Sequence, residues 1–465
     1  MFFYRQIEKY GDATALISAD GKKTSYSELT TAADSFAAAV DSHRLVFLLC
    51  SNNIESVVGY VACMRGSSVP AMLSEKIDPA LLDELMENYH PSYVWLPSQI
   101  RESVNGEVVF SYGNNVLVKM TYTLDYSISN ELKLLLTTSG STGSPKFVRQ
   151  TEKNIQSNTE SIVEYLEIRP DDRAITTMPM NYTYGLSILN SHLYCGAAVI
   201  LNEYTLMDKR FWALMKGEQA TTFGGVPYIY EMLKKLRFGR MDIPSLRYLT
   251  QAGGKLSPEL ADEFSEICRE RGMKFIVMYG QTEATARMAW RPWEYASSKS
   301  ASMGIAIPGG EFSLIDVDGS VIETPETVGE LVYRGDNVTM GYAQSRHDLA
   351  NGDENKGILY TGDMAKRDAD GFYYIVGRKK RFLKLFGNRV NLDEVEQLLK
   401  KQGIDCAVAG TDDNMVIYIT DESKYAKASD FIDNHTAISH GGFKIQVIPE
   451  IPRNESGKIL YSELK

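Results

Sequence analysis

Hydrophobic and polar positions alternate along the first two thirds of the chain in a pattern typical of strand–helix–strand units. A continuous apolar run covers 44–50, and apolar residues at helical spacing follow it over 51–66. Spacing of i, i+3 and i+4 predicts an amphipathic helix, whereas a short unbroken run predicts a buried strand. Another strand is expected at 67–73. Such units build parallel sheets, so this part of the chain predicts one.

The same alternation recurs further along the chain and then stops. Apolar runs that predict buried strands occur at 91–97, 133–140, 197–202, 246–254 and 274–283. We therefore expect an α/β fold with a large, layered N-terminal domain.

Short strands broken by glycine begin at about residue 300 and predict a β-rich subdomain over 300–379. A basic link and an amphipathic helix that starts at Asn391 follow. A chain of 465 residues is too long for one core. We predict an N-terminal domain at 1–379 and a small α+β C-terminal domain at 380–465.

Composition and charge narrow the class of protein. The chain is 44% hydrophobic and 23% charged, with a net charge of −11. These values favour a soluble protein and disfavour a nucleic-acid partner, which needs a basic face. The scattered cysteines form no CxxC pair, so we expect reduced, mostly buried thiols and a cytoplasmic location. We expect neither a signal peptide nor a membrane span, because no basic start precedes an apolar core and no run is long enough.

The stretch TTSGSTGSPK at 137–146 is the first candidate for chemistry. Glycines allow a tight turn, and consecutive amides and hydroxyls form a donor surface suited to phosphate, with Lys146 adding a positive charge. A flexible surface loop is the alternative. The stretch is not the P-loop GxxxxGK[ST], which argues against a P-loop NTPase.

Together with later motifs, this stretch resembles the phosphate loop of the adenylate-forming superfamily, which includes acyl-CoA synthetases, peptide-synthetase adenylation domains and luciferases. The other motifs follow in the family's order over nearly the whole chain. They are MPMNYTYGLS (178–187), YGQTEA (279–284), YTGD (360–363), GRKKRFLKLFGNRV (377–390) and PRNESGKI (452–459). The resemblance implies the family's fold, a large AMP-binding domain followed by a small mobile domain.

The resemblance implies binding of ATP with Mg²⁺. The implied ATP- and AMP-binding residues are Thr138, Ser139, Gly140, Ser141, Thr142, Gly143, Lys146, Gly253, Gly254, Tyr279, Gly280, Gln281, Thr282, Asp363, Arg378 and Lys458. The catalytic candidates are Lys458, Thr282 and Glu283.

Several of these roles also make physical sense from the residues alone. A Glu283 carboxylate beside a phosphate loop suits Mg²⁺, which prefers oxygen ligands shared with phosphates. Asp363 can accept both ribose hydroxyls. A Lys458 ammonium can stabilise charge on the α-phosphate during attack by a carboxylate. The alternatives are a solvated glutamate, a turn-stabilising aspartate and a surface lysine.

Two family features are altered or shifted here. Lys380 stands where the family usually has a hinge aspartate, and the resemblance implies that rotation there brings the Lys384 face toward the adenylate. Lys255 replaces the small or apolar residue that usually follows the adenine glycines.

The substrate motif contains no acid. Asn181, Tyr182, Thr183 and Tyr184 are the expected acid-pocket residues, with aromatic core packing as the alternative. Without a carboxylate to pair with an ammonium, α-amino acids are disfavoured. We expect a small hydroxylated, aryl or short-chain acid.

The resemblance therefore implies an AMP-forming carboxylate ligase that transfers the acyl group to a thiol. The acceptor is coenzyme A or the phosphopantetheine of an acyl carrier protein. The alternatives are an amino-acid-activating enzyme and an inactive nucleotide-binding regulator on the same fold. A luciferase-like monooxygenase is disfavoured, because nothing in the sequence supports an oxygenation site.

Overall fold

The computed structural model describes residues 1–122, 126–137, 146–316, 318–385, 388–411, 413–435, 440–453 and 459–464. Their contacts divide the chain into two units. The described residues of the first unit lie within 1–137, 146–311 and 333–359, and those of the second lie within 312–332 and 360–464. The segment 300–379 is thus shared between the units, and a domain boundary at 379/380 stays a prediction.

Two large mixed sheets form the frame of the first unit. In the described residues, the first sheet has eight strands in the order β19 (Gly341–Ala343), β9 (Phe147–Thr151), β8 (Leu132–Thr137), β4 (Val69–Ser74), β3 (Leu45–Cys50), β5 (Tyr93–Pro97), β7 (Asn115–Met120) and β6 (Gly106–Tyr112). The second has nine, in the order β16 (Ile305–Ala306), β15 (Ala289–Trp290), β14 (Lys274–Tyr279), β13 (Tyr248–Gln251), β12 (Thr222–Gly225), β10 (Arg173–Ile175), β11 (Ala198–Ile200), β1 (Thr14–Ile17) and β2 (Lys23–Ser25).

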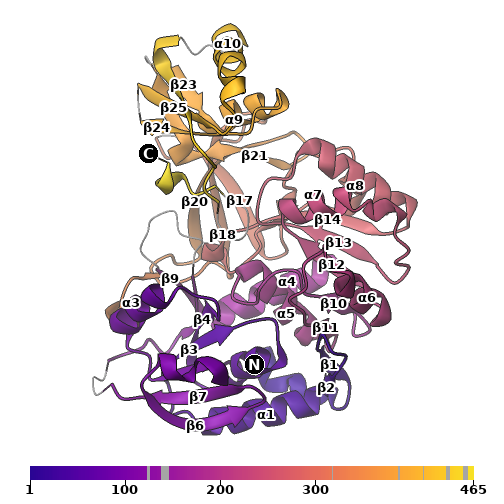
Figure 1. The fold of residues 1–465 in the computed structure, drawn as a ribbon, viewed down its shortest axis with the longest axis vertical. Helices are drawn as coiled ribbons and strands as arrows, with labels where there is room; N and C mark the ends of the chain where they lie inside the picture. Colours follow the sequence, from indigo (N-terminus) through magenta and orange to yellow (C-terminus); the bar gives the residue numbers. More distant parts are fainter. Residues whose placement is uncertain are drawn as a thin grey trace. The chain divides into compact units, whose positions relative to one another are not determined.

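The helices of the first unit cover both faces of both sheets (Figure 1). They are α1 (Tyr26–Ala38), α2 (Ile54–Arg65), α3 (Pro79–Tyr89), α4 (Glu152–Leu166), α5 (Thr183–Cys195), α6 (Lys209–Gly217), α7 (Pro227–Lys235) and α8 (Pro258–Glu270). One core joins α1, α2, α4 and α5 to both sheets, so these helices lie between them. A second core packs α6, α7 and α8 on the nine-stranded sheet, and a third packs α3 on the eight-stranded sheet.

Strand β3 shows why the unbroken apolar runs became central strands. Its residues are buried, and they alternate between two cores on opposite faces of the sheet. A strand covered on both faces needs apolar side chains at every position. The predicted parallel unit is confirmed, because β3 pairs in parallel with both β4 and β5. The strand β9 was missed, and it pairs antiparallel with β8.

The second unit contains most of a four-stranded sheet and two smaller sheets. The four-stranded sheet, β17 (Gly310–Ile315), β18 (Gly329–Gly335), β20 (Ile358–Arg367) and β21 (Tyr373–Arg378), starts within the first unit. The smaller ones are β22 (Phe382–Leu385) with β23 (Asn388–Asn391), and β24 (Cys406–Thr411) with β25 (Asn414–Ile419) and β26 (Phe443–Val447). Helices α9 (Leu392–Lys401) and α10 (Tyr425–His435) pack against them in one core. The predicted small α+β tail is confirmed.

Short 3-10 helices connect many of these elements. They are η1 (Phe3–Tyr10), η2 (Ser98–Ser103), η3 (Phe238–Arg240), η4 (Thr282–Ala284), η5 (Trp293–Tyr295), η6 (Arg346–Ala350), η7 (Lys379–Arg381), η8 (Glu422–Lys424), η9 (His440–Gly442) and η10 (Tyr461–Glu463).

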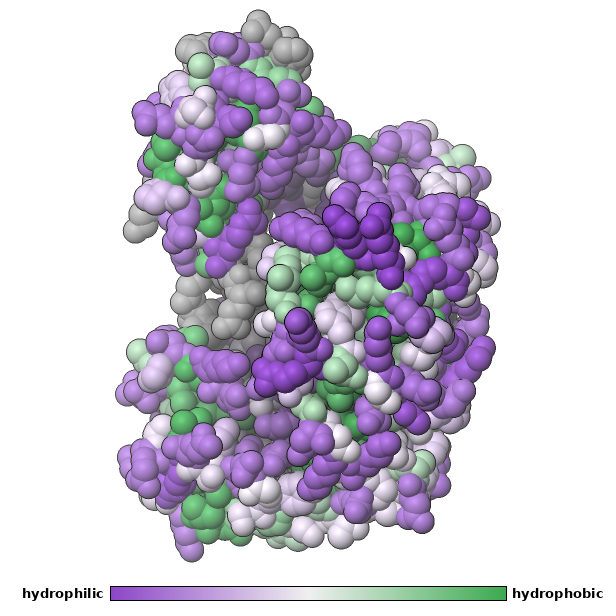
Figure 2. All heavy atoms as spheres, turned by 45° about the vertical axis from the view of Figure 1, so that its right-hand side comes forward, coloured by the Kyte–Doolittle hydropathy of each residue, from purple (hydrophilic) through white to green (hydrophobic). Residues whose placement is uncertain are grey.

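The surface and the cysteines agree with the composition. The face drawn in Figure 2 is mostly hydrophilic, with hydrophobic residues in small separate groups. Among the described residues, no helix combines the length and the apolar character needed to cross a bilayer. The expectation of buried thiols is confirmed, since all cysteines are free and only Cys195 is partly exposed.

Candidate active site

Most of the predicted motif residues in the first unit follow neighbouring strands of one sheet. Strands β10, β12, β13 and β14 are parallel, so their carboxyl ends meet at one edge. The aromatic motif follows β10, the glycine turn at 252–254 follows β13, and YGQTEA begins at the last residue of β14. Ligands of open α/β sheets bind outside the carboxyl ends of the strands. The topology therefore brings these motifs together, as the sequence predicts.

The glycine turn and the aromatic motif are in direct contact. Gly253 has a φ of +82°, and a Cβ atom there would meet the Tyr182 hydroxyl at 2.6 Å. Both the positive φ and this close approach require glycine. The Gln251 side chain fixes the turn by donating to the carbonyl oxygen of Gly254 at 2.9 Å. Tyr182, predicted for the acid pocket, thus also lies against Gly253, which the resemblance assigns to nucleotide binding.

The turn that carries Glu283 is held by the segment 337–339. Thr339 donates from its hydroxyl to the Glu283 carbonyl oxygen at 2.9 Å, and Asn337 donates to that of Ala284 at 3.0 Å. Thr285 has a φ of +64°, which is rare for a β-branched residue. Its hydroxyl donates to the Asn337 carbonyl oxygen at 2.7 Å. These contacts hold a strained turn in place, as is common where a backbone must present a site.

Glu283, Tyr342 and Lys146 form a cluster in the first unit. The Tyr342 hydroxyl donates to Glu283 Oε1 at 2.6 Å, and the Lys146 ammonium lies 3.5 Å from the centre of the Tyr342 ring. Strand pairing explains the meeting, because β19 lies antiparallel to β9, which starts immediately after Lys146. Sequence reasoning missed Tyr342. The only available signal was its position in an aromatic–glycine strand of the β-rich segment.

This cluster fits a magnesium ion bound together with phosphates. Mg²⁺ is usually held by one or two carboxylates plus substrate phosphates rather than by a full protein cage. Tyr342 orients one oxygen of Glu283, while no side chain within the described ranges forms a hydrogen bond with the other. Among the described residues, no three or more His, Cys, Asp or Glu side chains are grouped so that they could hold a metal ion.

The four predicted acid-pocket residues play different parts. The Thr183 hydroxyl donates to the Thr285 carbonyl oxygen, and the Tyr184 hydroxyl forms a hydrogen bond with Thr250 Oγ1 at 2.8 Å. Asn181 Oδ1 is buried and has no hydrogen-bond partner among the described residues. Thr183 and Tyr184 thus support the turn and the strands, while Asn181 keeps a buried acceptor that no described residue uses.

In the second unit, Asp363 and Arg378 face each other on paired strands. They are direct partners in the β20–β21 ladder, and Arg378 Nε lies 2.7 Å from Asp363 Oδ1. The Asp363 side chain is 3% exposed, whereas that of Arg378 is 55% exposed. The fold therefore joins the two residues that the resemblance assigns to the ribose.

The predicted hinge residue Lys380 lies in η7, between Lys379 and Arg381, whose side chains form ion pairs with different elements. Lys379 pairs with Glu330 of β18 at 2.6 Å. Arg381 instead pairs with Asp393 at 2.8 Å and with Glu396 at 2.6 Å, both on α9. The Arg381 guanidinium also lies 3.9 Å from the Tyr461 ring centre. The chain thus changes its attachment from one sheet to a helix within three residues.

Several predicted residues cannot be placed in this structure. Lys458 and the phosphate-loop residues Thr138, Ser139, Gly140, Ser141, Thr142 and Gly143 lie outside the described residues, as do the side chains of Lys380 and Lys384. Their roles stay predictions.

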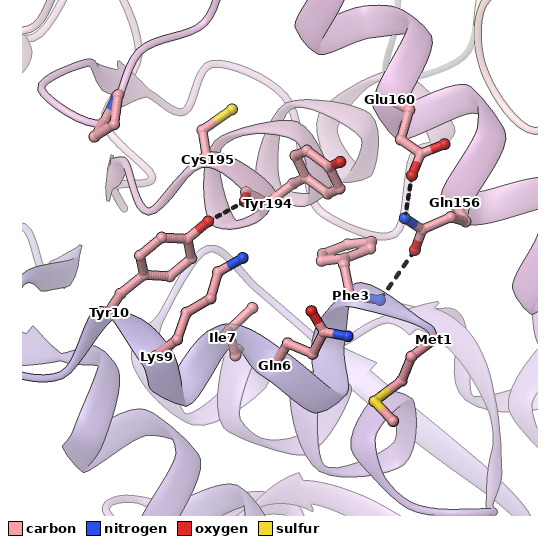
Figure 3. Close-up of a pocket in the computed structure, with 11 residues that line it drawn as sticks. Met1, Phe3, Gln6, Ile7, Lys9, Tyr10, Gln156, Glu160, Tyr194 and Cys195 are labelled. Carbon is pink, nitrogen blue, oxygen red and sulfur yellow. Dashed lines mark hydrogen bonds between the residues drawn. The ribbon is translucent and has the colours of Figure 1, made fainter.

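A separate cavity of about 360 Å³ opens beside η1, at the Cys195 end of α5 (Figure 3). It is lined by side chains from η1, α4 and α5, including Lys9, Glu160 and Cys195. Thr183 and Cys195 are at opposite ends of α5, about 18 Å apart at 1.5 Å per residue. This cavity therefore does not belong to the site at the carboxyl edge.

Comparisons with known proteins show a family match over most of the chain. The family model for "AMP-binding enzyme" matches residues 3–343. An oxalate–CoA ligase of Arabidopsis thaliana is 31% identical over 271 residues, covering 57% of this chain and 52% of that protein. A 2-succinylbenzoate–CoA ligase of Listeria monocytogenes serotype 4b is 23% identical over 468 residues, covering 97% of this chain and 96% of that protein.

The fold has a counterpart among solved structures. The o-succinylbenzoate CoA synthetase of Bacillus subtilis, in complex with ATP and magnesium ion, aligns with a TM-score of 0.78 and 22% identity, covering 100% of this chain and 99% of that one. This likeness confirms the predicted fold. The match spans about half the length of the plant relatives with which this chain aligns, and nearly all of the Listeria protein.

Proposed function

The chain belongs to the AMP-binding enzyme family of the adenylate-forming superfamily, and from this premise we propose that it is an ATP-dependent, AMP-forming acid–thiol ligase. Its substrates are ATP, a small carboxylic acid and a thiol. The relatives named above as CoA ligases support coenzyme A as the acceptor. The phosphopantetheine of an acyl carrier protein is the second candidate acceptor.

The proposed reaction has two steps. A carboxylate oxygen of the acid attacks the α-phosphorus of ATP, and the bond from that phosphorus to the pyrophosphate oxygen breaks. The sulfur of the thiol then attacks the acyl carbonyl carbon, its proton passes to solvent, and AMP leaves with the electrons of the broken C–O bond. Neither step needs a protein nucleophile. The residues instead hold the reactants and stabilise the developing charge.

The observation that carries the proposal is the Glu283–Tyr342–Lys146 cluster. It presents one carboxylate with a fixed oxygen beside one ammonium, at the edge where the nucleotide motifs meet. When bound, Mg²⁺ would neutralise phosphate charge there, with Glu283 as its protein ligand. Thr282 would donate to a phosphate oxygen, and Lys146 would hold another phosphate. Asp363 and Arg378 would bind the ribose, and Lys458 would stabilise the α-phosphate during attack.

The proposed location is the cytoplasm. All cysteines are free, and four of them are buried. Reduced thiols persist in the reducing cytosol, whereas secreted proteins of this kind tend to carry disulfides.

The first step is tested by ATP–pyrophosphate exchange with a panel of carboxylic acids. Exchange reports acyl-adenylate formation whatever the acceptor is. We expect acid-dependent exchange with at least one small aryl or short-chain acid and none with the proteinogenic amino acids. Exchange with amino acids alone would instead support the amino-acid-activating alternative. Absence of exchange with every acid, combined with measurable ATP binding, would support the inactive regulator.

The second step is tested at the proposed hinge. One fixed arrangement cannot easily present Lys458 to the α-phosphate and later admit the thiol to the same carbonyl, so Lys380 would absorb a rotation between the steps. Proline would restrict the backbone there. We expect Lys380→Pro to retain exchange and to lose thioester formation, and Lys380→Ala to retain both. Equal loss of both half-reactions in Lys380→Pro, or loss of neither, would mean that Lys380 is not the pivot.

A further inference from the structure

Arg287 is a buried cation in the first unit without a carboxylate partner among the described residues. It follows the YGQTEA motif and is only 2% exposed. Arginine is almost never fully buried unless it is paired, because desolvating its charge is costly. The groups around Arg287 therefore indicate which role its charge has.

The contacts of the Arg287 side chain are neutral. Its Nη1 lies 3.1 Å from the Tyr165 hydroxyl and 3.1 Å from Met278 Sδ. The guanidinium carbon lies 5.0 Å from the centre of the Tyr184 ring, a residue of the predicted acid pocket. The Nε atom is buried and has no hydrogen-bond partner in the described residues. The fold thus leaves a donor of this cation unused.

A small cavity adjoins Arg287. It measures about 10 Å³ and is lined from α5, β12 and β13, including His192, Thr250 and Tyr248. Such a space holds one water-sized atom. The Tyr248 hydroxyl is buried there beside Thr222 without a hydrogen bond of normal geometry. Two unpartnered donors, from Arg287 and Tyr248, therefore belong to residues that line one cavity.

The other ionisable groups around the cavity do not balance the Arg287 charge. Burial lowers the pKa of His192 to about 4, so its imidazole is neutral at pH 7. The carboxylate that interacts electrostatically with Tyr248 and His192 belongs to Asp172. Arg247 holds both Asp172 oxygens, at 2.8 Å and 2.6 Å. Arg287 therefore keeps a positive charge without a carboxylate partner among the described residues, 5.0 Å from the ring centre of Tyr184.

We propose that Arg287, with Tyr248, recognises a second carboxylate on the acid substrate, so that the enzyme activates dicarboxylic acids. This inference rests on the proposed function. One oxygen of the distal carboxylate would occupy the space next to Arg287 Nε and the Tyr248 hydroxyl, while the carboxylate to be activated faces the nucleotide. Charge-assisted hydrogen bonds to a guanidinium are among the strongest in proteins. A substrate ammonium would be repelled at this position, which also disfavours amino acids.

The alternative role for Arg287 is structural. Its contacts with Tyr165 and Tyr184 connect α4 and α5 to the turn after β14. A purely structural arginine would affect the free energy of unfolding and would leave the choice between acids unchanged. The two roles therefore differ in a measurable way.

The test measures exchange kinetics on matched acids that differ by one carboxylate, such as butanoate against glutarate and benzoate against isophthalate. The variants are Arg287→Met, which removes the charge, Arg287→Lys, which keeps it, and Tyr248→Phe, which removes only the hydroxyl. For wild type we expect kcat/KM to favour the dicarboxylate of at least one pair by about a hundredfold or more, since sites built for a polar group reject analogues that lack it. Arg287→Met should lose that preference and retain or gain activity on the monocarboxylate. Arg287→Lys should keep part of the preference, and Tyr248→Phe should reduce it less than Arg287→Met.

A binding measurement separates specificity from stability. The preferred dicarboxylate should raise the melting temperature of the wild type and of Arg287→Lys. If Arg287→Met folds, the same acid should not raise its melting temperature. An unchanged preference in a folded Arg287→Met would overturn the inference. If Arg287→Met does not fold, an unchanged preference in both Arg287→Lys and Tyr248→Phe would overturn it. So would a wild type that uses only monocarboxylates, although the proposed ligase function would stand. No exchange with any acid would instead refute the ligase function.

Discussion

The two units hold their polar site residues in different ways. In the first unit, buried side chains bond to backbone carbonyl groups, as Thr339 and Asn337 do around the Glu283 turn. In the second unit, charged side chains pair with one another, as in Asp363–Arg378 and Lys379–Glu330. Backbone anchors fix a geometry, whereas partly exposed ion pairs are weak and can exchange partners. This difference fits the proposal that the first unit positions the reactants and that the second changes its contacts during the reaction.

The Asp172–Arg247 ion pair of the first unit tests whether a buried charge in this unit contributes only to stability and not to the choice of acid. Asp172 is 1% exposed and paired with Arg247. Asp172→Ala leaves the partly exposed Arg247 guanidinium and the Thr221 hydroxyl without their acceptor, so we expect the free energy of unfolding to fall by about 3 kcal/mol. Chemical denaturation measures this loss. The exposed neighbour variant Asp171→Ala is the control and should change stability little. Altered acid preference in folded Asp172→Ala would contradict a purely structural role.

The same pair predicts a dependence on pH. Burial opposes ionisation of Asp172, but the bonds from Arg247 and Thr221 hold its pKa below the ordinary value. A carboxyl group with a lowered pKa in the folded state stabilises the protein above its unfolded pKa, near 4. That contribution is lost as the pH falls through the folded pKa. Asp172→Ala should therefore flatten the stability profile on the acid side.

Lys458 is the strongest test of charge in the second unit. Lys458→Ala is expected to lower the kcat of ATP–pyrophosphate exchange by about a hundredfold or more, because it removes charge stabilisation needed chiefly in the transition state. ATP binding and the melting temperature should stay nearly unchanged. Lys444→Ala, at an exposed position of β26, is the matched control. Wild-type exchange in Lys458→Ala would remove Lys458 from the mechanism.

Asp363 tests whether a paired charge of the second unit also binds the nucleotide. Asp363→Ala should weaken ATP binding by about 1–3 kcal/mol, since ribose hydroxyls lose their acceptor. Calorimetric titration with ATP measures the change, and Asp370→Ala in the turn after β20 serves as the control. Unchanged affinity would assign Asp363 to the structure of the β20–β21 hairpin.

Tyr342 tests the anchoring of Glu283 in the first unit and has the smallest expected effect. Tyr342→Phe removes one hydrogen bond to Glu283, which is worth about 1 kcal/mol net, so the Mg²⁺ concentration for half-maximal exchange should rise about 3- to 10-fold. Tyr89→Phe is a matched control, because the Tyr89 hydroxyl donates to the carbonyl oxygen of Ala343, next to Tyr342. An equal rise in both variants would show that β19 as a whole, rather than the bond to Glu283, sets Mg²⁺ affinity.

The sequence determined the central strands and their helices, because local patterns encode them. The run at 44–50 must be a strand covered on both faces, and the helical spacing after it produces α2 (Ile54–Arg65). Motif order also identified the superfamily. The carboxyl-edge location of YGQTEA follows from parallel pairing of β12, β13 and β14, which the repeated strand–helix pattern anticipates.

Only the tertiary structure decided which polar side chains meet and which are buried. Tyr342 lies 59 residues from Glu283 in the chain, and only the pairing of β19 with β9 brings it there. Arg247 and Arg287 look alike as residues, yet one receives the Asp172 carboxylate and the other receives none within the described residues. Sequence periodicity reports whether a segment has an apolar face. It does not report which distant segment supplies a countercharge, because that depends on the packing of helices and sheets in three dimensions.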